Sequence, residues 1–335
     1  MKVPFLNLEA AHSSIAAEIE AELLRVARSG PYVLGPELER FETAFADYLG
    51  APHCAGLANG LDALRLGLMA MGIGPGDEVI VPANTYIATW LAVSQCGATP
   101  VPVEPREDTY NIDPDGIRAA ITERTRAILP VHLYGQPADM DTIEAIAEAH
   151  DLWVLEDGAQ AHGARYKGRR IGAKGHVTWS FYPTKNLGAL GDGGALTTKD
   201  DTIAAQTRLL RNYGSAIKYE NQLKGVNSRL DPLQAAVLSV KLAALDAATV
   251  KRQQIADRYS QSFGSAGLNI PHVPGWAEPV WHLYVLRHAN RDAFQHRLSK
   301  AGIGTVIHYP IPPHLQEAYA DAGHSRGAFP VSERL

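Results

Sequence analysis

The sequence predicts an α/β protein in which a largely parallel central sheet is flanked by helices and followed by a smaller α+β C-terminal domain. Short apolar runs alternate with segments of helical periodicity through the first part of the chain. Such alternation is typical of parallel strands covered by helices on both faces. It ends at a long helical pattern that begins near Pro232, and shorter strand-like and helical segments follow. We therefore expect a large domain over residues 1–250, including the N-terminal helices, and a small domain over 251–335.

Composition and charge narrow the class of protein. The 335 residues are 46% hydrophobic and 20% charged, which is an ordinary globular composition. No run of about 18 apolar residues occurs, so no membrane span is expected. A net charge of -5 provides no basic surface for nucleic acid. The first residues lack the apolar core of a signal peptide and only two cysteines are present, so a cytoplasmic location is expected.

The expected elements follow from periodicity and from the residues that start and stop helices. An amphipathic helix is predicted over 13–30, with Ser13 or Ser14 at its start, and a second helix over 36–49. Strands are expected at 78–82, 99–103, 126–131, 152–157 and 177–181. Helices are expected between them at 61–71, 86–96, 115–121 and 140–150. Asp231 and Pro232 start the long helix. The small domain should contain a strand at 281–285 and a helix at 291–301.

One lysine is distinguished by its neighbours. Lys185 lies between the aromatic run 180–183 and a glycine-rich segment at 188–194, where a backbone can approach a ligand closely. A lysine that attacks a carbonyl group must first lose its proton, and burial near other cations lowers its pKa. Lys185 is therefore a candidate for the covalent attachment of a carbonyl compound. The same residues also fit an ordinary surface lysine beside a turn.

Further segments carry candidate binding groups. Gly60 opens a predicted helix, and the unpaired N–H groups of a helix start suit a phosphate, although an ordinary helix cap has the same sequence. Asp157 ends a predicted buried strand, where a carboxylate can pair with a protonated pyridine nitrogen, cap the next turn or bind a metal. Tyr86 follows another strand and fits either a ring-stacking aromatic or a core residue. His162 fits a base, a ligand or a structural histidine.

Two later segments also offer polar groups to a ligand. Asn227 and Arg229 precede the long helix and present an amide and a cation, while a simple helix entry explains the same residues. The segment 307–315 concentrates two histidines, a tyrosine and three prolines. A rigid loop of this kind can present side chains to a substrate or serve as a plain connector.

The order of these segments resembles that of one known family. The motifs, in register along nearly the whole chain, are ANGLDAL, NTYIAT, LEDGAQAHGARYKG, SFYPTKNLGALGDGG, NSRLDPLQAAVL and IHYPIPPHLQ. Together they resemble the pyridoxal-phosphate-dependent sugar aminotransferases of the DegT/DnrJ/EryC1/StrS family, which have the aspartate aminotransferase (type I) fold. The resemblance implies a homodimeric enzyme with active sites at the subunit interface. It also implies pyridoxal 5'-phosphate as cofactor, pyridoxamine 5'-phosphate as its second form, and no metal.

The resemblance assigns roles to individual residues. Lys185 matches the lysine that binds the cofactor covalently and moves a proton, and Asp157 matches the partner of the pyridine nitrogen. Gln160 matches the side chain near the ring hydroxyl, and Tyr86 matches the aromatic residue that stacks on the ring. The residues matched to phosphate binding are Gly60, Leu61 and Ser180, together with Asn227, which would reach the cofactor of the partner subunit.

The resemblance also implies a reaction. The motifs look most like those of members that transfer an amino group, expected to come from L-glutamate, to C3 of a dTDP-linked 3-keto-6-deoxyhexose in amino-sugar biosynthesis. A C4 nucleotide-sugar aminotransferase, a keto-inositol aminotransferase and a noncatalytic cofactor-binding regulator are the alternatives. The residues suggested for substrate contact are Arg211, Tyr213, His308 and Tyr309. Family members usually extend some tens of residues further, so the small domain is expected to be truncated.

Overall fold

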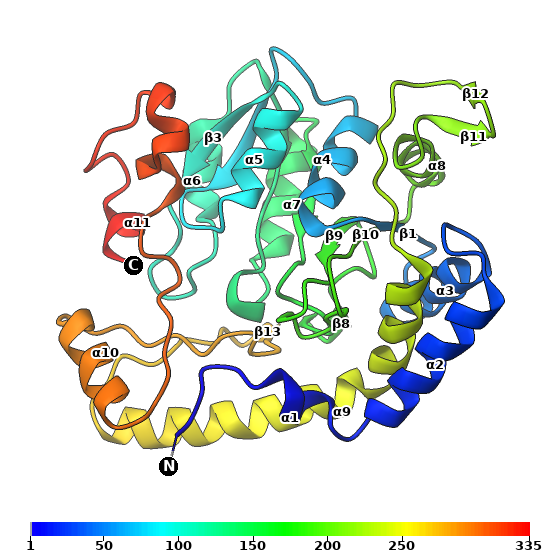
Figure 1. Cartoon of the computed structure of the whole chain (residues 1–335). Coiled ribbons are helices and arrows are strands. Elements are labelled where there is room, and N and C mark those ends of the chain that lie inside the picture. The colour runs from blue at the N-terminus through cyan, green and yellow to red at the C-terminus, as the bar shows by residue number, and fades with distance from the viewer. Residues whose placement is uncertain (1) are drawn as a thin grey trace.

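The computed structural model describes residues 2–335 and shows an α/β architecture (Figure 1). One four-stranded part of the central sheet is parallel and has the order β3 (Thr99–Val103), β2 (Glu78–Pro82), β4 (Thr125–Ile128), β5 (Trp153–Val154). The other part has the order β1 (His53–Leu57), β10 (Gly194–Thr198), β9 (His176–Ser180), β6 (Glu156–Asp157). The parts join because Leu155 connects β5 to β6 and donates its N–H to Ile128 O at 3.1 Å.

The second part of the sheet is where the structure differs from the sequence prediction. β10 runs antiparallel to both β1 and β9, whereas β6 and β9 are parallel. Neither β1 nor β10 is predicted from the sequence. β1 contains the small residues Cys54, Ala55 and Gly56, and β10 begins with Gly194 and Ala195, so the local preference for a strand is weak. Long-range pairing within the sheet defines these two strands.

Helices cover both faces of the sheet. Those before the first strand are α1 (Leu8–His12), α2 (Ala16–Ser29) and α3 (Pro36–Leu49). Those among the strands are α4 (Gly60–Ala70), α5 (Ala88–Gln95), α6 (Pro114–Ala120), η1 (Leu133–Gly135), α7 (Met140–Ala149) and α8 (Asp201–Leu210). The later ones are α9 (Pro232–Ser265), α10 (Arg291–Lys300), η2 (Pro313–Leu315), η3 (Glu317–Ala322) and α11 (Pro330–Arg334). The short strands are β7 (Arg165–Tyr166), β8 (Arg169–Arg170), β11 (Ser215–Ile217), β12 (Glu220–Asn221) and β13 (Ala277–Glu278).

Two hydrophobic clusters fill the spaces between the sheet and its helices. Ile80 of β2 belongs to the cluster that contains residues of α3, α7 and α9, whereas its neighbours Val79 and Val81 belong to the cluster with α4, α5 and α8. Because successive side chains of a strand point to opposite faces, the clusters lie on opposite sides of the sheet. Burial on both faces explains why β2 is continuously apolar after its first residue.

The predicted start of the first long helix at Ser13 or Ser14 is wrong. Ser13 instead ends the short helix α1, because its N–H donates to Glu9 O at 3.0 Å. α2 begins after Ile15 without a side-chain cap. The predicted helix over 13–30 therefore corresponds to α2 with its start placed too early, and α1 is not predicted from the sequence.

The predicted strand at 281–285 is also wrong. The backbone of this segment pairs with η1 rather than with a strand, since Leu283 N–H donates to Tyr134 O at 3.3 Å and Val280 N–H donates to Gly135 O at 2.9 Å. The segment 281–285 is therefore an irregular connection, because it lies beside the helical turn η1 and has no strand to pair with.

α9 spans the expected domain boundary between residues 250 and 251 without a break. Among the described residues it alone is long and apolar enough to cross a membrane by length and composition. That is a weak indication, because a core helix has the same properties, and α9 packs against α2 and α3 in this structure (Figure 1). The end of the chain, which contains α11, returns to the large domain, where Ser332 N–H donates to Glu104 Oε2 at 2.9 Å.

Candidate active site

The candidate site lies where β6 and β9 end, and Lys185 is positioned there by a tight turn. Lys185 N–H donates to Tyr182 O at 2.8 Å, and Ala189 N–H donates to Phe181 O at 2.8 Å. A Cβ atom on Gly188 would lie 2.5 Å from Pro183 O, so only glycine fits the turn at this position. The glycine-rich sequence thus folds the chain back beside the strand and leaves the lysine facing the end of the sheet.

The Lys185 amine is in a setting that favours its neutral form. The side chain is half-buried, and burial lowers the pKa of Lys185, while the negative charge of Asp157 raises it less strongly. Two histidines lie in the same electrostatic environment. Burial lowers the pKa of His162 to about 3, and the charge of Lys185 adds to this effect. Burial also lowers the pKa of His282, again assisted by Lys185. Both imidazoles are therefore neutral near neutral pH.

Asp157 is the buried acid of the site, with a side chain only 6% exposed. Thr89 Oγ1 donates to its Oδ2 at 3.1 Å, and Ala159 N–H donates to its Oδ1 at 3.1 Å. Burial raises the pKa of Asp157, while the Ala159 hydrogen bond and the Lys185 charge oppose that rise. The Asp157 carboxyl group is thus fixed in orientation, and a cationic partner would stabilise its ionised form.

A second buried pair supports the strand that carries Asp157. His132 Nε2 lies 2.9 Å from Glu156 Oε2, and His132 Nδ1 accepts the Ala138 N–H at 3.0 Å. Since Nδ1 is an acceptor, Nε2 carries the proton that is donated to Glu156. The His132 backbone N–H also donates to Asp157 O at 3.0 Å. His132 therefore links η1 to the end of β6.

The start of α4 forms a compact cradle with the end of β9. Asn59 Oδ1 accepts the Asp62 N–H at 2.8 Å, and the first N–H groups of any helix have no acceptor within the helix. A Cβ atom on Gly60 would lie 2.6 Å from Ser180 Cβ, so the close approach requires glycine. The backbone N–H groups of Gly60 and Leu61 and the Ser180 hydroxyl are thus brought together, a donor set that suits a phosphate.

Tyrosines from distant parts of the chain surround Gln160. Gln160 Oε1 accepts the Tyr134 N–H at 2.6 Å, and Gln160 Nε2 donates to Tyr309 Oη at 3.1 Å. Tyr134 Oη donates to His308 O at 2.6 Å. The Tyr309 ring centroid is 5.8 Å from that of Tyr86, whose side chain is 58% exposed. Four of the sequence-predicted residues, namely Tyr86, Gln160, His308 and Tyr309, therefore meet at one place.

The remaining predicted residues lie elsewhere on the chain. Tyr213 and Asn227 are exposed, and the Arg229 guanidinium lies 5.7 Å from the Tyr213 ring centroid. Arg211 is buried and donates to Glu42 Oε1 and to Gly56 O. Its guanidinium is thus engaged inside the protein rather than presented to a substrate. Within the described residues, none of these four side chains forms a hydrogen bond to Lys185 or Asp157.

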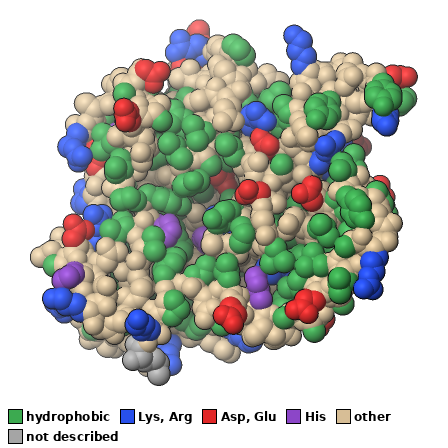
Figure 2. Space-filling view, viewed as in Figure 1, with side chains coloured by type: hydrophobic (Ala, Val, Ile, Leu, Met, Phe, Trp, Pro, Cys, Tyr) green, Lys and Arg blue, Asp and Glu red, His purple; other side chains and the backbone are tan. Residues whose placement is uncertain are grey.

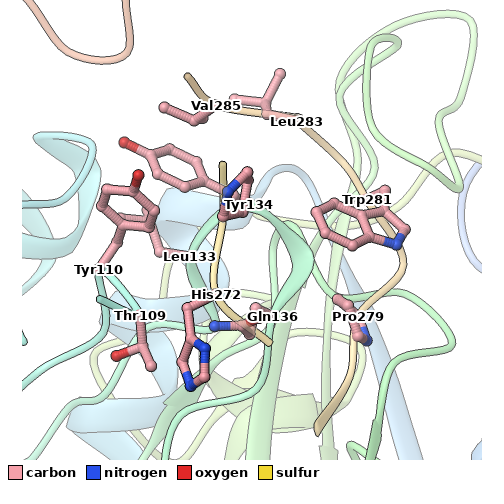
Figure 3. Close-up of a pocket in the computed structure, with 11 residues that line it drawn as sticks. Thr109, Tyr110, Leu133, Tyr134, Gln136, His272, Pro279, Trp281, Leu283 and Val285 are labelled. Carbon is pink, nitrogen blue, oxygen red and sulfur yellow. The ribbon is translucent and has the colours of Figure 1, made fainter. Parts of the chain in front are cut away.

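Thr89, His132 and His282 belong to the site, but motif reasoning does not find them. Thr89 lies three residues after Tyr86 and thus on the same side of the helical turn, which is a signal the sequence does contain. His282 Nδ1 lies 3.2 Å from Asn186 Oδ1, next to Lys185. Its neighbours Trp281 and Leu283 instead line a separate hollow (Figure 3). Only the folded structure shows that His282 lies beside Lys185 while the residues on either side of it line another hollow.

These residues fit pyridoxal phosphate by several independent features. The cradle requires glycine for its close approach, Asp157 is a fixed buried carboxylate, and Lys185 has a lowered pKa. Phosphate, ring nitrogen and aldehyde each have a complementary group. Figure 2 shows hydrophobic side chains with histidines among them near the middle of the visible face.

The comparisons with known proteins agree with this geometry. Residues 13–335 match the model of the DegT/DnrJ/EryC1/StrS aminotransferase family, and the chain belongs to that family. It is 53% identical over 334 residues to the dTDP-3-amino-3,4,6-trideoxy-alpha-D-glucose transaminase of Streptomyces venezuelae, covering 99% of this chain and 88% of the relative. It is also 53% identical over 334 residues to the dTDP-3-amino-3,6-dideoxy-alpha-D-galactopyranose transaminase of Aneurinibacillus thermoaerophilus, covering 99% and 92%.

A solved structure extends the likeness to three dimensions. The crystal structure of S. venezuelae DesV in complex with a ketimine intermediate has a TM-score of 0.98 and 52% identity, covering 99% of this chain and 90% of that chain. The predictions of the type I fold, of an aminotransferase and of pyridoxal phosphate as cofactor are thereby confirmed. The roles of individual residues stay predictions.

Proposed function

We propose that this aminotransferase moves an amino group from an amino acid, most simply L-glutamate, to C3 of a dTDP-linked 3-keto-6-deoxyhexose. The observation that carries the proposal is 53% identity over 99% of the chain to a transaminase named for a dTDP-3-amino sugar. A second relative at the same identity is named for a different 3-amino sugar. The position of amination is therefore supported, while the two sugars have equal support.

The cofactor is proposed to bind at the end of the sheet. Gly60, Leu61 and Ser180 would bind its phosphate, and Asp157 would pair with its ring nitrogen. Tyr86 would stack on the ring, and Gln160 would lie near the ring hydroxyl. Lys185 would bind it covalently. When bound, pyridoxal phosphate supplies an electron sink for the carbon that loses or gains a proton.

The residues of the chain then orient the substrate and move protons. Burial lowers the pKa of Lys185 and so favours the neutral amine, which is the form that would accept and return a proton at Nζ. Burial raises the pKa of Asp157, so a cationic partner would favour its ionised form. His308 and Tyr309 are proposed to contact the sugar, because the Gln160 hydrogen bond places Tyr309 beside the candidate site.

A homodimer in the cytoplasm is part of the same proposal. Asn227 and Tyr213 are exposed, and neither side chain forms a hydrogen bond to Lys185 or Asp157. This is the arrangement expected of residues that serve the site of a partner subunit. Light scattering of the purified protein tests the dimer. A monomer that keeps full activity would contradict the shared site.

The substrate assignment has a direct experiment. The protein is first converted with L-glutamate to its pyridoxamine phosphate form and then mixed with dTDP-linked 3-keto and 4-keto sugars. We expect the aldehyde absorbance to return only with 3-keto sugars. Return only with 4-keto sugars would contradict C3 amination, and a cofactor that glutamate never converts would instead favour a regulatory protein. Lys185→Ala, which cannot move the proton, provides the inactive reference.

A further inference from the structure

On the outer side of the edge strand β1, backbone hydrogen-bonding groups are paired with side chains instead of with another strand. β1 is the outermost strand of its part of the sheet, beside β10. The outward backbone groups of its alternate residues need other partners. Glu42 Oε1 accepts the Gly56 N–H at 2.7 Å, and Arg211 Nη1 donates to Gly56 O at 2.8 Å. Glu42 and Arg211 also form an ion pair with each other, and both are buried.

The same Arg211 is connected to the segment that follows β1. Its backbone oxygen accepts the Ser228 N–H at 2.9 Å. The buried Ser228 Oγ in turn accepts the Ala58 N–H at 3.2 Å. Ala58 precedes the Asn59 cap and Gly60, where the proposed phosphate cradle begins. Arg211 thus contacts β1 directly at Gly56 and holds Ala58, which follows β1, through Ser228.

We propose that the Glu42–Arg211 pair positions the phosphate cradle of the cofactor site. The inference rests on the proposed role of Gly60, Leu61 and Ser180, and it gives Arg211 a positioning role in place of the substrate contact suggested by the sequence. The cradle has little freedom, because a Cβ on Gly194 would lie 2.3 Å from Asn59 O. A small displacement of β1 would therefore move the N–H groups of α4 away from Ser180.

The Glu42–Arg211 pair is suited to this task because the free-energy cost of burying each charge is offset only when both partners are present. Removing one member of a buried ion pair leaves an uncompensated charge in a low-dielectric setting. Here that charge would also lose or distort a hydrogen bond to Gly56. The backbone of β1 would then shift, and β1 leads directly into the cradle. Arg211→Lys keeps the charge but is a shorter side chain, and it replaces the guanidinium nitrogen Nη1 that donates to both Glu42 Oε1 and Gly56 O.

The test compares two ligands that differ only in the phosphate. The dissociation constants of pyridoxal phosphate and of pyridoxal are measured by visible absorbance on the apo forms of wild type, Arg211→Lys and Glu42→Gln. We expect the affinity for pyridoxal phosphate to fall about tenfold, the lower end of the effect that lost outer-shell partners have on bound metals. The affinity for pyridoxal should change by less than about twofold on the same reasoning.

A matched control lies one turn earlier on α8. Arg208 Nη2 donates to Cys54 O at 2.9 Å, so Arg208→Lys alters an arginine contact to β1 that lies further from the cradle than Gly56 and involves neither Glu42 nor Ser228. Its ratio of the two dissociation constants should equal that of wild type. If Arg211→Lys does not fold, Ser228→Ala removes only the acceptor for Ala58 N–H, and its ratio should still shift toward pyridoxal.

The outcomes separate this inference from the proposed function. A wild-type protein that binds both ligands equally would contradict the cradle itself. A wild-type preference for pyridoxal phosphate that Glu42→Gln and Ser228→Ala leave unchanged would overturn only the role of the pair. Equal weakening of both ligands in these variants would also overturn it, because that result indicates general destabilisation.

Discussion

The site has two parts that the fold holds in different ways: the chemical half, which is Lys185 and Asp157, and an exposed rim. Lys185 and Asp157 are at least half-buried, and both carboxylate oxygens of Asp157 have hydrogen-bond donors in the same chain. We call the exposed residues Tyr86, Tyr213 and Asn227 the rim; Tyr86 and Asn227 are proposed to contact the cofactor, and Tyr213 is suggested for substrate contact. The comparison teaches that the fold alone fixes the orientation of Asp157 and shifts the pKa values of Asp157 and Lys185. Substrate choice is left to side chains that gain contacts only when a ligand or a partner subunit is present.

The largest effect should come from Lys185→Ala. Because this variant loses both the covalent anchor and the proton carrier, glutamate-dependent conversion of the cofactor should slow by about 10⁴-fold or more. Stopped-flow absorbance measures the rate. Lys174→Ala, at an exposed lysine, should match wild type. Substantial conversion by Lys185→Ala would place the proton carrier elsewhere.

Asp157→Asn should have the next largest effect. The variant keeps the shape of the side chain but cannot supply a negative charge to the ring nitrogen, so the single-turnover rate should fall about a hundredfold or more. The dissociation constant of the nucleotide sugar should stay near that of wild type. If a rim variant slowed the half-reaction with glutamate equally, the division of the site into two halves would be wrong.

Tyr213→Ala tests the rim. Loss of an exposed aromatic surface should raise KM for the nucleotide sugar about tenfold and leave the glutamate half-reaction within about twofold. Steady-state and half-reaction kinetics separate the two. Tyr219→Ala is the control, because Tyr219 is a more exposed tyrosine of the same segment. Equal effects of the two substitutions would remove any specific role for Tyr213.

The smallest effect should come from Thr89→Val. The Thr89 hydroxyl lowers the pKa of Asp157, so its removal should raise that pKa and make the acid easier to protonate. The acidic limb of the rate profile should therefore move to higher pH, with a plateau reduced about threefold. Thr85→Val is the comparison, since Thr85 contacts Thr89 at 2.9 Å. A limb that moves to lower pH would contradict the assigned hydrogen bond.

The residues that the sequence selects for the chemistry occupy strand ends and glycine turns in the structure. Asp157 and Lys185 follow strong apolar runs, and Gly60 opens a recognisable helix. Arg211 shows the limit. Its position in a motif suggests a ligand contact, yet its partners Glu42 and Gly56 are about 150 residues or more away in sequence. Such pairing depends on β1 and β10, whose small residues give little local signal.

The measurement that tests the account most directly is chemical trapping of the bound cofactor. The protein loaded with pyridoxal phosphate is reduced with borohydride, digested and mapped by mass spectrometry. Lys241 provides an internal comparison, because burial also lowers its pKa, to about 8, and it contacts Gly188 O near the site. We predict that the reduced cofactor is attached at Lys185 and that Lys241 is unmodified. Attachment at Lys241, or no attachment at all, would contradict the account.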